Sequence, residues 1–153
     1  MNSKKNTEKK LTIKKLKVTN YNYKINMTRD KQIVNLRPVI NTINSELVKT
    51  DQEKFQNEVI RPIIKFQHEL IIKIFSNYLQ MKNIDLTSMS PENKVAKITS
   101  VLQTDRLLII ELKCIIVAYF TSSEYENYTS MKSEVNKRLI QIIRERILSI
   151  MII

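Results

Sequence analysis

The chain of 153 residues contains no glycine. Glycine takes positive φ without steric cost, and tight hairpin turns and phosphate-binding loops depend on it. A chain without glycine is a poor candidate for a β-sheet built on hairpins. It also cannot carry a glycine-rich phosphate loop or a nucleophile elbow in the usual form. Connections between helices can use Asn, Asp and Ser instead, so we expect an all-α fold.

The size and charge of the chain predict one helical domain preceded by a basic tail. A chain of this length buries one modest core. The net charge is +11, but residues 1–31 hold ten Lys and Arg against two carboxylates, which leaves +8 there and +3 for the rest. We expect residues 1–26 to be a disordered basic tail, or an extension ahead of a start at Met27. Residues 27–153 are expected to form a single helical domain.

The longest periodic segment predicts a central helix from Asp51 to Lys82. Thr50 and Glu53 have the spacing of a capping box at its start, and Asn83 is a suitable cap at its end. Pro62 removes one amide and is expected to kink this helix or to open a second one. The apolar stripe covers about half of the circumference: Phe55, Val59, Ile63, Phe66, Leu70 and Ile74, widened by Ile60, Ile64, Ile71, Phe75 and Tyr78.

The rest of the sequence completes a small helical bundle around this Pro-kinked helix. Ser90-Pro91 starts a short helix. The segment from Leu107 to Phe120, apolar on nearly all sides, predicts a buried helix or a buried strand, and its length and caps favour the helix. Thr121 and Glu124 form a second capping box, which starts a C-terminal helix in two parts. Residues 147–153 are so apolar that we expect them to dock on their own core or on another subunit.

The apolar stretch from Ile33 to Ile40 is broken by Pro38. We expect it to lie extended against the core before a helix or turn.

The sequence predicts no catalytic, cofactor-binding or metal site. Cys114 lies in an apolar run and is expected to be a small buried hydrophobic residue. His68, the only histidine, falls on the polar face of the central helix, and nothing completes a metal site around it. No Ser, Thr or Cys has a recognisable base. With no secretory signal and no membrane-spanning segment, the sequence favours a cytoplasmic protein.

Two glutamines fall inside the predicted apolar arc, Gln56 and Gln67. A buried amide without a hydrogen bond costs about 1–3 kcal/mol. Either these amides bond to a neighbouring helix or to the carbonyl freed near Pro62, or they line a pocket or a subunit interface. The candidate interface or cleft residues are Arg61, Gln67, Tyr78 and Tyr125.

The basic tail offers a second kind of surface, to which nucleic acid can bind. The alternative is a solvated run of charge. The lysines that it offers for such binding are Lys4, Lys5, Lys9, Lys10, Lys14, Lys15 and Lys17.

A further pattern runs through Phe55-Gln56-Asn57, Arg61-Pro62-Ile63-Ile64-Lys65-Phe66-Gln67, Phe120-Thr121, Glu124-Tyr125, Tyr128, Asn136-Lys137-Arg138 and Glu145-Arg146. Over roughly Met27 to Leu148 it resembles a group of short all-helical bacterial proteins labelled "glyoxalase". The label implies a lactoylglutathione lyase. Glyoxalases of the vicinal-oxygen-chelate class have βαβββ units and His and Glu metal ligands, whereas this chain has one His and no Gly. No catalytic residue carries over.

Three functions follow as hypotheses. The first is a non-enzymatic interaction module that self-associates through its apolar C-terminus and one face of the central helix. The second is a nucleic-acid-associated protein that binds through its tail, and the third is a glyoxalase-type enzyme.

Overall fold

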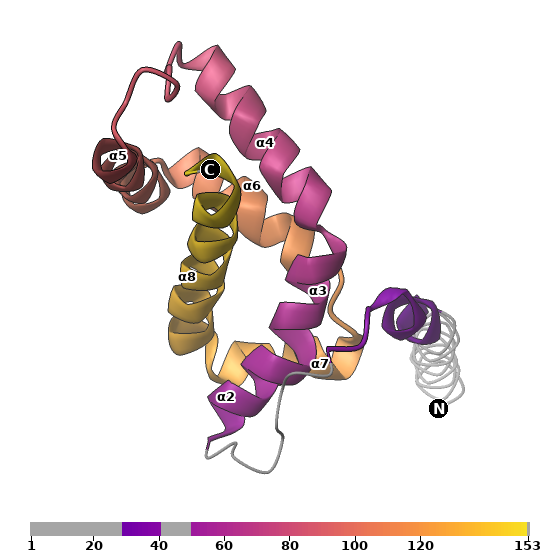
Figure 1. Ribbon diagram of the computed structural model, residues 1–153. Helices are drawn as coiled ribbons and strands as arrows, with labels where there is room; N and C mark the ends of the chain where they lie inside the picture. Colours follow the sequence, from indigo (N-terminus) through magenta and orange to yellow (C-terminus); the bar gives the residue numbers. More distant parts are fainter. Residues whose placement is uncertain (1–28, 41–49, 153) are drawn as a thin grey trace, which may run out of the picture.

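The computed structural model describes residues 29–40 and 50–152, which form helices joined by turns and irregular segments, with no strand among them (Figure 1). The predicted all-α fold is confirmed. Residues 29–36 are helical. The elements that follow are α2 (Asp51–Phe55), the π-helical turn η2 (Gln56–Ile60), α3 (Arg61–Phe66), α4 (His68–Met81), α5 (Pro91–Thr104), α6 (Arg106–Val117), α7 (Ser122–Ser130) and α8 (Lys132–Met151).

The central helix is interrupted twice. The amide of Arg61 bonds to the carbonyl of Gln56, five residues back, so the wide turn η2 stands directly before Pro62. Pro62 occupies the first turn of α3, where its missing amide costs least. The second break is at Gln67, whose φ of −87° and ψ of 10° leave the helical region. The predicted interruption at Pro62 is therefore confirmed, and the one at Gln67 is additional.

These breaks change which residues of the central helix are buried. Phe66 and Leu70, which belong to the predicted stripe, are 39% and 45% exposed, whereas Ile71 and Phe75 are fully buried. A π-turn inserts one residue into the helical repeat, and an irregular turn at Gln67 adds a second shift of phase. The predicted stripe is thus correct up to Ile64 and for Ile71 and Phe75, and wrong for Phe66 and Leu70. Their partly exposed side chains lie on an outer face of the helix.

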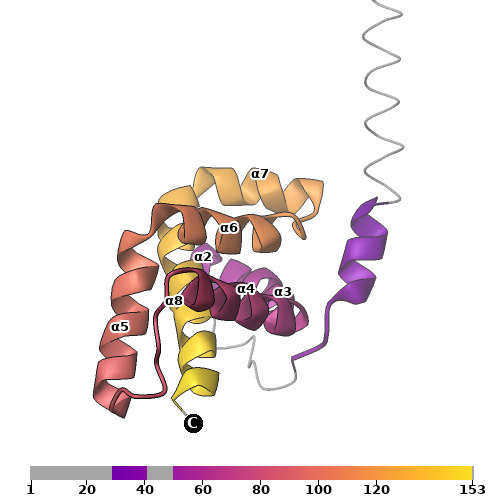
Figure 2. The ribbon, with the colours of Figure 1, turned by 90° about the horizontal axis from the view of Figure 1, so that it is seen from above.

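The core is centred on α8. Figure 2 shows α8 between α5 and the α3–α4 pair, with α6 and α7 forming a layer across them. The inward stripe of α8 is buried at four-residue steps: Val135, Leu139, Ile143 and Ile147. Ile147 is fully buried, so the apolar end of the chain docks on its own core, which was one of the two predicted outcomes.

The end of α4 shows how the chain turns without glycine. Asn83 has a φ of 51°, in the left-handed region, and it is the one described residue with positive φ. The Ile84 amide donates to the Leu79 carbonyl at 2.9 Å and the Asn83 amide to the Gln80 carbonyl at 3.1 Å. These two bonds make a Schellman motif with Asn in the position that Gly usually fills. The predicted cap at Asn83 is confirmed.

The predicted starts of the later helices are confirmed by their caps. Ser90 accepts a hydrogen bond from the Asn93 amide at the start of α5, directly before Pro91. Thr121 accepts from the Glu124 amide, and the Glu124 carboxylate accepts from the Thr121 amide, which completes the capping box of α7. The chain changes direction again at Met131, between α7 and α8, so the two-part C-terminal helix is also confirmed.

The segment before the central helix differs from the prediction. Residues 29–36 are helical, so the part of the Ile33–Ile40 stretch up to Leu36 is not extended. Ile33 is buried, whereas Val34 and Leu36 are half exposed. The helix ends before Arg37-Pro38, as expected when proline disfavours the helical conformation of the residue before it.

Candidate functional site

Helix α6 has two apolar sides, and the described residues bury only one of them. Leu108, Leu112 and Ile116 face the core and are buried. On the opposite side Leu107 is 80% exposed and Ile110 is 52% exposed. The predicted helix over this segment is confirmed, but the expectation that it is buried is wrong for this side. The outer residues form a ridge along α6 that the described part of the chain leaves uncovered.

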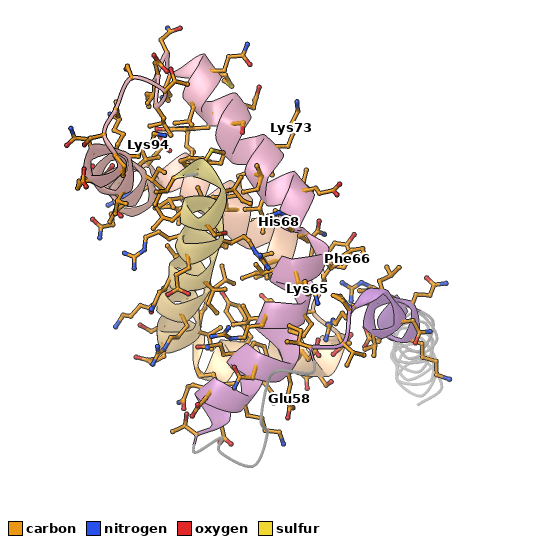
Figure 3. All side chains as sticks on the ribbon, viewed as in Figure 1. Glu58, Lys65, Phe66, His68, Lys73 and Lys94 are labelled. Atoms are coloured by element: carbon orange, nitrogen blue, oxygen red, sulfur yellow. The ribbon has the colours of Figure 1, made fainter. Side chains whose placement is uncertain are left out.

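A groove of about 370 Å³ runs beside this ridge, between α4 and α6. Its apolar lining includes Ile74, Tyr78 and Leu108. The exposed side of the central helix continues the same surface, since the ring of Phe66 lies 5.3 Å from that of Tyr119, just after α6. In Figure 3, Phe66 points away from α8. We call the following residues the apolar face: Phe66, Leu70, Ile74, Met81, Leu107 and Ile110.

The charges around this groove are balanced. Lys73 and Lys82 line it together with Asp105 and Glu111. The Tyr78 hydroxyl donates to Asp105 Oδ2 at 3.0 Å. Burial, then the hydrogen bond to Asp105 and its negative charge, raise the pKa of Tyr78. The pKa of Asp105 lies below its ordinary value, chiefly because the Leu108 amide donates to its carboxylate at the start of α6. Asp105 therefore fixes the start of α6 and the position of Tyr78.

A larger groove of about 740 Å³ lies on the other side of the ridge, between α6 and α7. Its walls are mostly apolar and include Ile110, Val117 and two tyrosines, Tyr125 and Tyr128, whose ring centroids are 5.9 Å apart. Arg29 closes one part of it. The ridge of α6 is thus flanked by a groove on each side.

The helical segment 29–36 is attached beside this larger groove mainly by polar contacts. Arg29 donates to the carbonyl oxygens of Phe120 and Ala118 at 2.8 and 2.7 Å, where α6 has ended. Asp30 accepts from the Ser122 amide at 3.0 Å, at the start of α7. Arg37 makes two hydrogen bonds to the Glu124 carboxylate, at 2.6 and 2.7 Å. These contacts fix the α6–α7 junction.

The Glu124 carboxylate accepts hydrogen bonds from Arg37 and from the Thr121 amide. Burial alone would raise its pKa, but the hydrogen bond from Arg37, the bond from the Thr121 amide and the Arg37 charge together hold the pKa of Glu124 below its ordinary value. The carboxylate stays ionised and serves the helix start and Arg37 at once. Its hydrogen bonds to Arg37 and the Thr121 amide hold the start of α7 in place.

The four residues predicted to line an interface or cleft lie in separate places. Tyr78 lines the α4–α6 groove, Tyr125 lines the α6–α7 groove and Arg61 lines a groove between α3 and α8. Gln67 is buried, at 7% exposure. Gln56 is half-buried. The structure brings Tyr78 and Tyr125 to the two sides of the α6 ridge.

Two other expectations need correction. Cys114 is exposed, because it lies on the outer side of α6, one turn after Ile110. His68 is half-buried, and its Nδ1 is buried without a hydrogen-bond partner among the described residues. The helical phase that put His68 on the polar face assumes an unbroken helix, and the turn at Gln67 breaks it.

Other expectations concern metals, membranes and the tail. Within residues 29–40 and 50–152, no group of three or more His, Cys, Asp or Glu is placed to hold a metal ion. None of the described helices is long and apolar enough to cross a bilayer. The tail lysines from Lys4 to Lys17 lie outside the described residues.

Sequence reasoning missed the exposure of Leu107 and Ile110 and the attachment by Arg29 and Arg37. The apolar pattern of α6 did signal two sides in need of partners, although it could not show that one lacks them. Arg37 and Glu124 are 87 residues apart, so no local pattern links them.

Comparison of the chain with protein-family models, with curated proteins and with solved structures finds no match. The resemblance to the group labelled "glyoxalase" stays a prediction.

Proposed function

We propose that the protein is a non-enzymatic interaction module that associates with a second copy of itself through the apolar face. One observation carries this proposal. The outer side of α6 presents Leu107 and Ile110 to solvent, although the helix already contributes a full inward side to the core. Apolar surface of this kind, rimmed by polar groups, is typical of a protein interface.

A second copy is the occupant that the surface fits best. The face carries a protruding ridge, with Leu107 and Ile110, directly beside a groove lined by Ile74 and Tyr78. Two copies related by a two-fold axis can place the ridge of each in the groove of the other, because such interfaces use the same patch twice. The two lysines and two carboxylates at the rim give each copy both charge signs, so association brings no net repulsion.

The apolar face must also be large enough to form a stable interface. A stable interface buries roughly 800 Å² on each partner. A 12-residue helix such as α6 is about 18 Å long, and its ridge alone is too narrow for that area. The partly exposed Phe66 and Leu70 and the exposed Met81 extend the surface across α4. The proposal therefore includes one face of the central helix, as the sequence predicted.

The proposal leaves the C-terminus out of the interface. Ile143 and Ile147 are fully buried in the core of their own chain. Deletion of residues 147–153 would remove part of this core, so loss of association after that deletion would not identify an interface.

The experiment is sedimentation velocity on the wild-type chain and on Leu107→Glu and Ile110→Glu. We expect a dimer for the wild type and a shift to monomer for both variants, since each places a charge at the centre of an apolar contact. Both residues are largely exposed, so the variants should fold, which circular dichroism can check.

The matched control is Val39→Glu. Val39 is 81% exposed and lies outside the apolar face, so the same type of substitution there should leave the dimer intact. A wild-type chain that sediments as a monomer at every concentration would contradict the proposal, as would equal dissociation of all three variants.

The other two hypotheses keep their own tests. Binding of nucleic acid through the basic tail predicts a steep salt dependence, by nearly one log unit per decade for each neutralised phosphate. A glyoxalase-type enzyme predicts metal content and activity on the methylglyoxal–glutathione adduct.

A further inference from the structure

A separate groove lies between α3 and the second half of α8. It has a volume of about 440 Å³, and its lining includes Arg61 and Lys65 from α3 and Arg146 from α8. Pockets for small molecules commonly have volumes of roughly 300–1,000 Å³. The apolar face shares no residue with this groove and lies on α4, α6 and the end of α3, so the two surfaces can be tested by separate substitutions.

The groove collects positive charge that the described part of the chain does not neutralise. Against its three cations stands one carboxylate, Glu145, which accepts a hydrogen bond from Gln141 at 3.1 Å. The ion pairs among the described residues are Arg29–Asp30 and Arg37–Glu124, and neither involves this groove. Three cations minus one carboxylate leave a net charge of +2.

The three cations repel one another, although Arg61 and Lys65 are exposed to solvent. Arg61 and Lys65 are four residues apart on one helix, where like charges repel each other. Arg146 adds a third charge from the facing helix. A bound anion removes this repulsion, and a guanidinium group can donate two parallel hydrogen bonds to phosphate oxygens.

Apolar and hydrogen-bonding groups complete the groove. Ile64 and Ile142 line it, and Ile64 is almost fully buried. Ser149 also lines it. A polar ligand group can therefore find three cations and an apolar wall within one groove.

We propose that this groove binds a small organic phosphate with at least two negative charges. Arg61, Lys65 and Arg146 hold the phosphate oxygens, and the organic part packs on the partly exposed Ile142. A small ligand fits better than nucleic acid, because nucleic acid requires a basic surface that extends along its backbone, whereas these cations share one short groove.

The test is isothermal titration calorimetry of the full chain with two probes, inorganic pyrophosphate and adenosine triphosphate. Pyrophosphate measures the phosphate contacts alone, and the nucleotide adds the organic part. We expect saturable binding of both, with the nucleotide bound more tightly. Arg61→Gln and Arg146→Gln should each weaken both probes by about tenfold, since each removes charged hydrogen bonds.

The matched control is Lys73→Gln. Lys73 is exposed on α4, two turns beyond Lys65, and extends outward in Figure 3. It should leave both affinities unchanged. Equal loss in the control, or no saturable binding of either probe at millimolar concentration, would overturn the proposal. So would tighter binding of a single-stranded oligonucleotide that needs the same two arginines, because it would identify a nucleic-acid surface.

Discussion

Helices α8 and α6 are both rich in apolar residues, but the other described helices bury these residues to different extents. The stripe of α8 is narrow and fully covered, with Leu139, Ile143 and Ile147 at zero exposure. The apolar residues of α6 surround the helix, and among the described residues those facing the core are buried, whereas Leu107 and Ile110 are exposed. An apolar pattern therefore shows which residues need a partner. It does not show whether the same chain supplies it.

Removal of apolar volume gives the largest contrast between the two helices. Ile143→Ala should lower the free energy of unfolding by about 2–5 kcal/mol, because it opens a cavity in the core. Ile110→Ala should change it by less than about 0.5 kcal/mol when measured at a protein concentration too low for association. Urea unfolding of both variants tests this. Equal losses would mean that the outer side of α6 is packed within its own chain.

The next largest loss of stability is expected when the contacts that attach residues 29–37 to the α6–α7 junction are removed. Arg37→Ala leaves the partly buried Glu124 carboxylate without its two hydrogen bonds from Arg37, and we expect a loss of about 2 kcal/mol. Thermal unfolding measures it. Arg37→Lys keeps the charge but not the paired geometry and should recover part of the loss. An unchanged melting temperature in Arg37→Ala would show that the attachment contributes nothing to stability.

The same pair predicts a dependence of stability on pH. The folded-state pKa of Glu124 is depressed, so its contribution is present above the unfolded pKa, about 4.3, and is lost as pH falls through the lower folded value. The wild type should lose stability below about pH 4.3. Glu124→Gln should show a shallower loss over that range. Parallel curves for the two proteins would contradict the assignment.

The smallest expected effect concerns the rim of the apolar face. Tyr78→Phe removes the hydrogen bond to Asp105 and should cost about 0.5–1.5 kcal/mol. Tyr125→Phe is the control, since Tyr125 is 48% exposed, and it should be neutral. Chemical denaturation distinguishes them. A neutral Tyr78→Phe would show that the bond to Asp105 does not help to hold α4 against α6.

Local chemistry made much of the fold predictable. The caps at Ser90 and Thr121 and the glycine-free turn at Asn83 depend on residues within a few positions of each other. The side of the central helix that is buried after Gln67 was not predictable. It depends on the π-turn and on the non-helical Gln67, and no local sequence pattern indicates either of them.

The candidate site was harder to predict for a related reason. Tyr78 and Tyr125 were found as candidates, but their positions on either side of α6 depend on how distant segments pack. The exposure of Leu107 and Cys114 depends on which side of α6 the other helices cover. No periodic pattern within α6 indicates which side the other helices cover.

The most direct test of the central claim uses Cys114, the only cysteine of the chain, as a reporter on the α6 ridge. Its alkylation rate by a maleimide can be followed against protein concentration, with sedimentation under the same conditions giving the fraction of dimer. The self-association account predicts that the rate falls in parallel with dimer formation, because the partner covers the ridge. A dimer whose Cys114 reacts at the monomer rate would contradict the account.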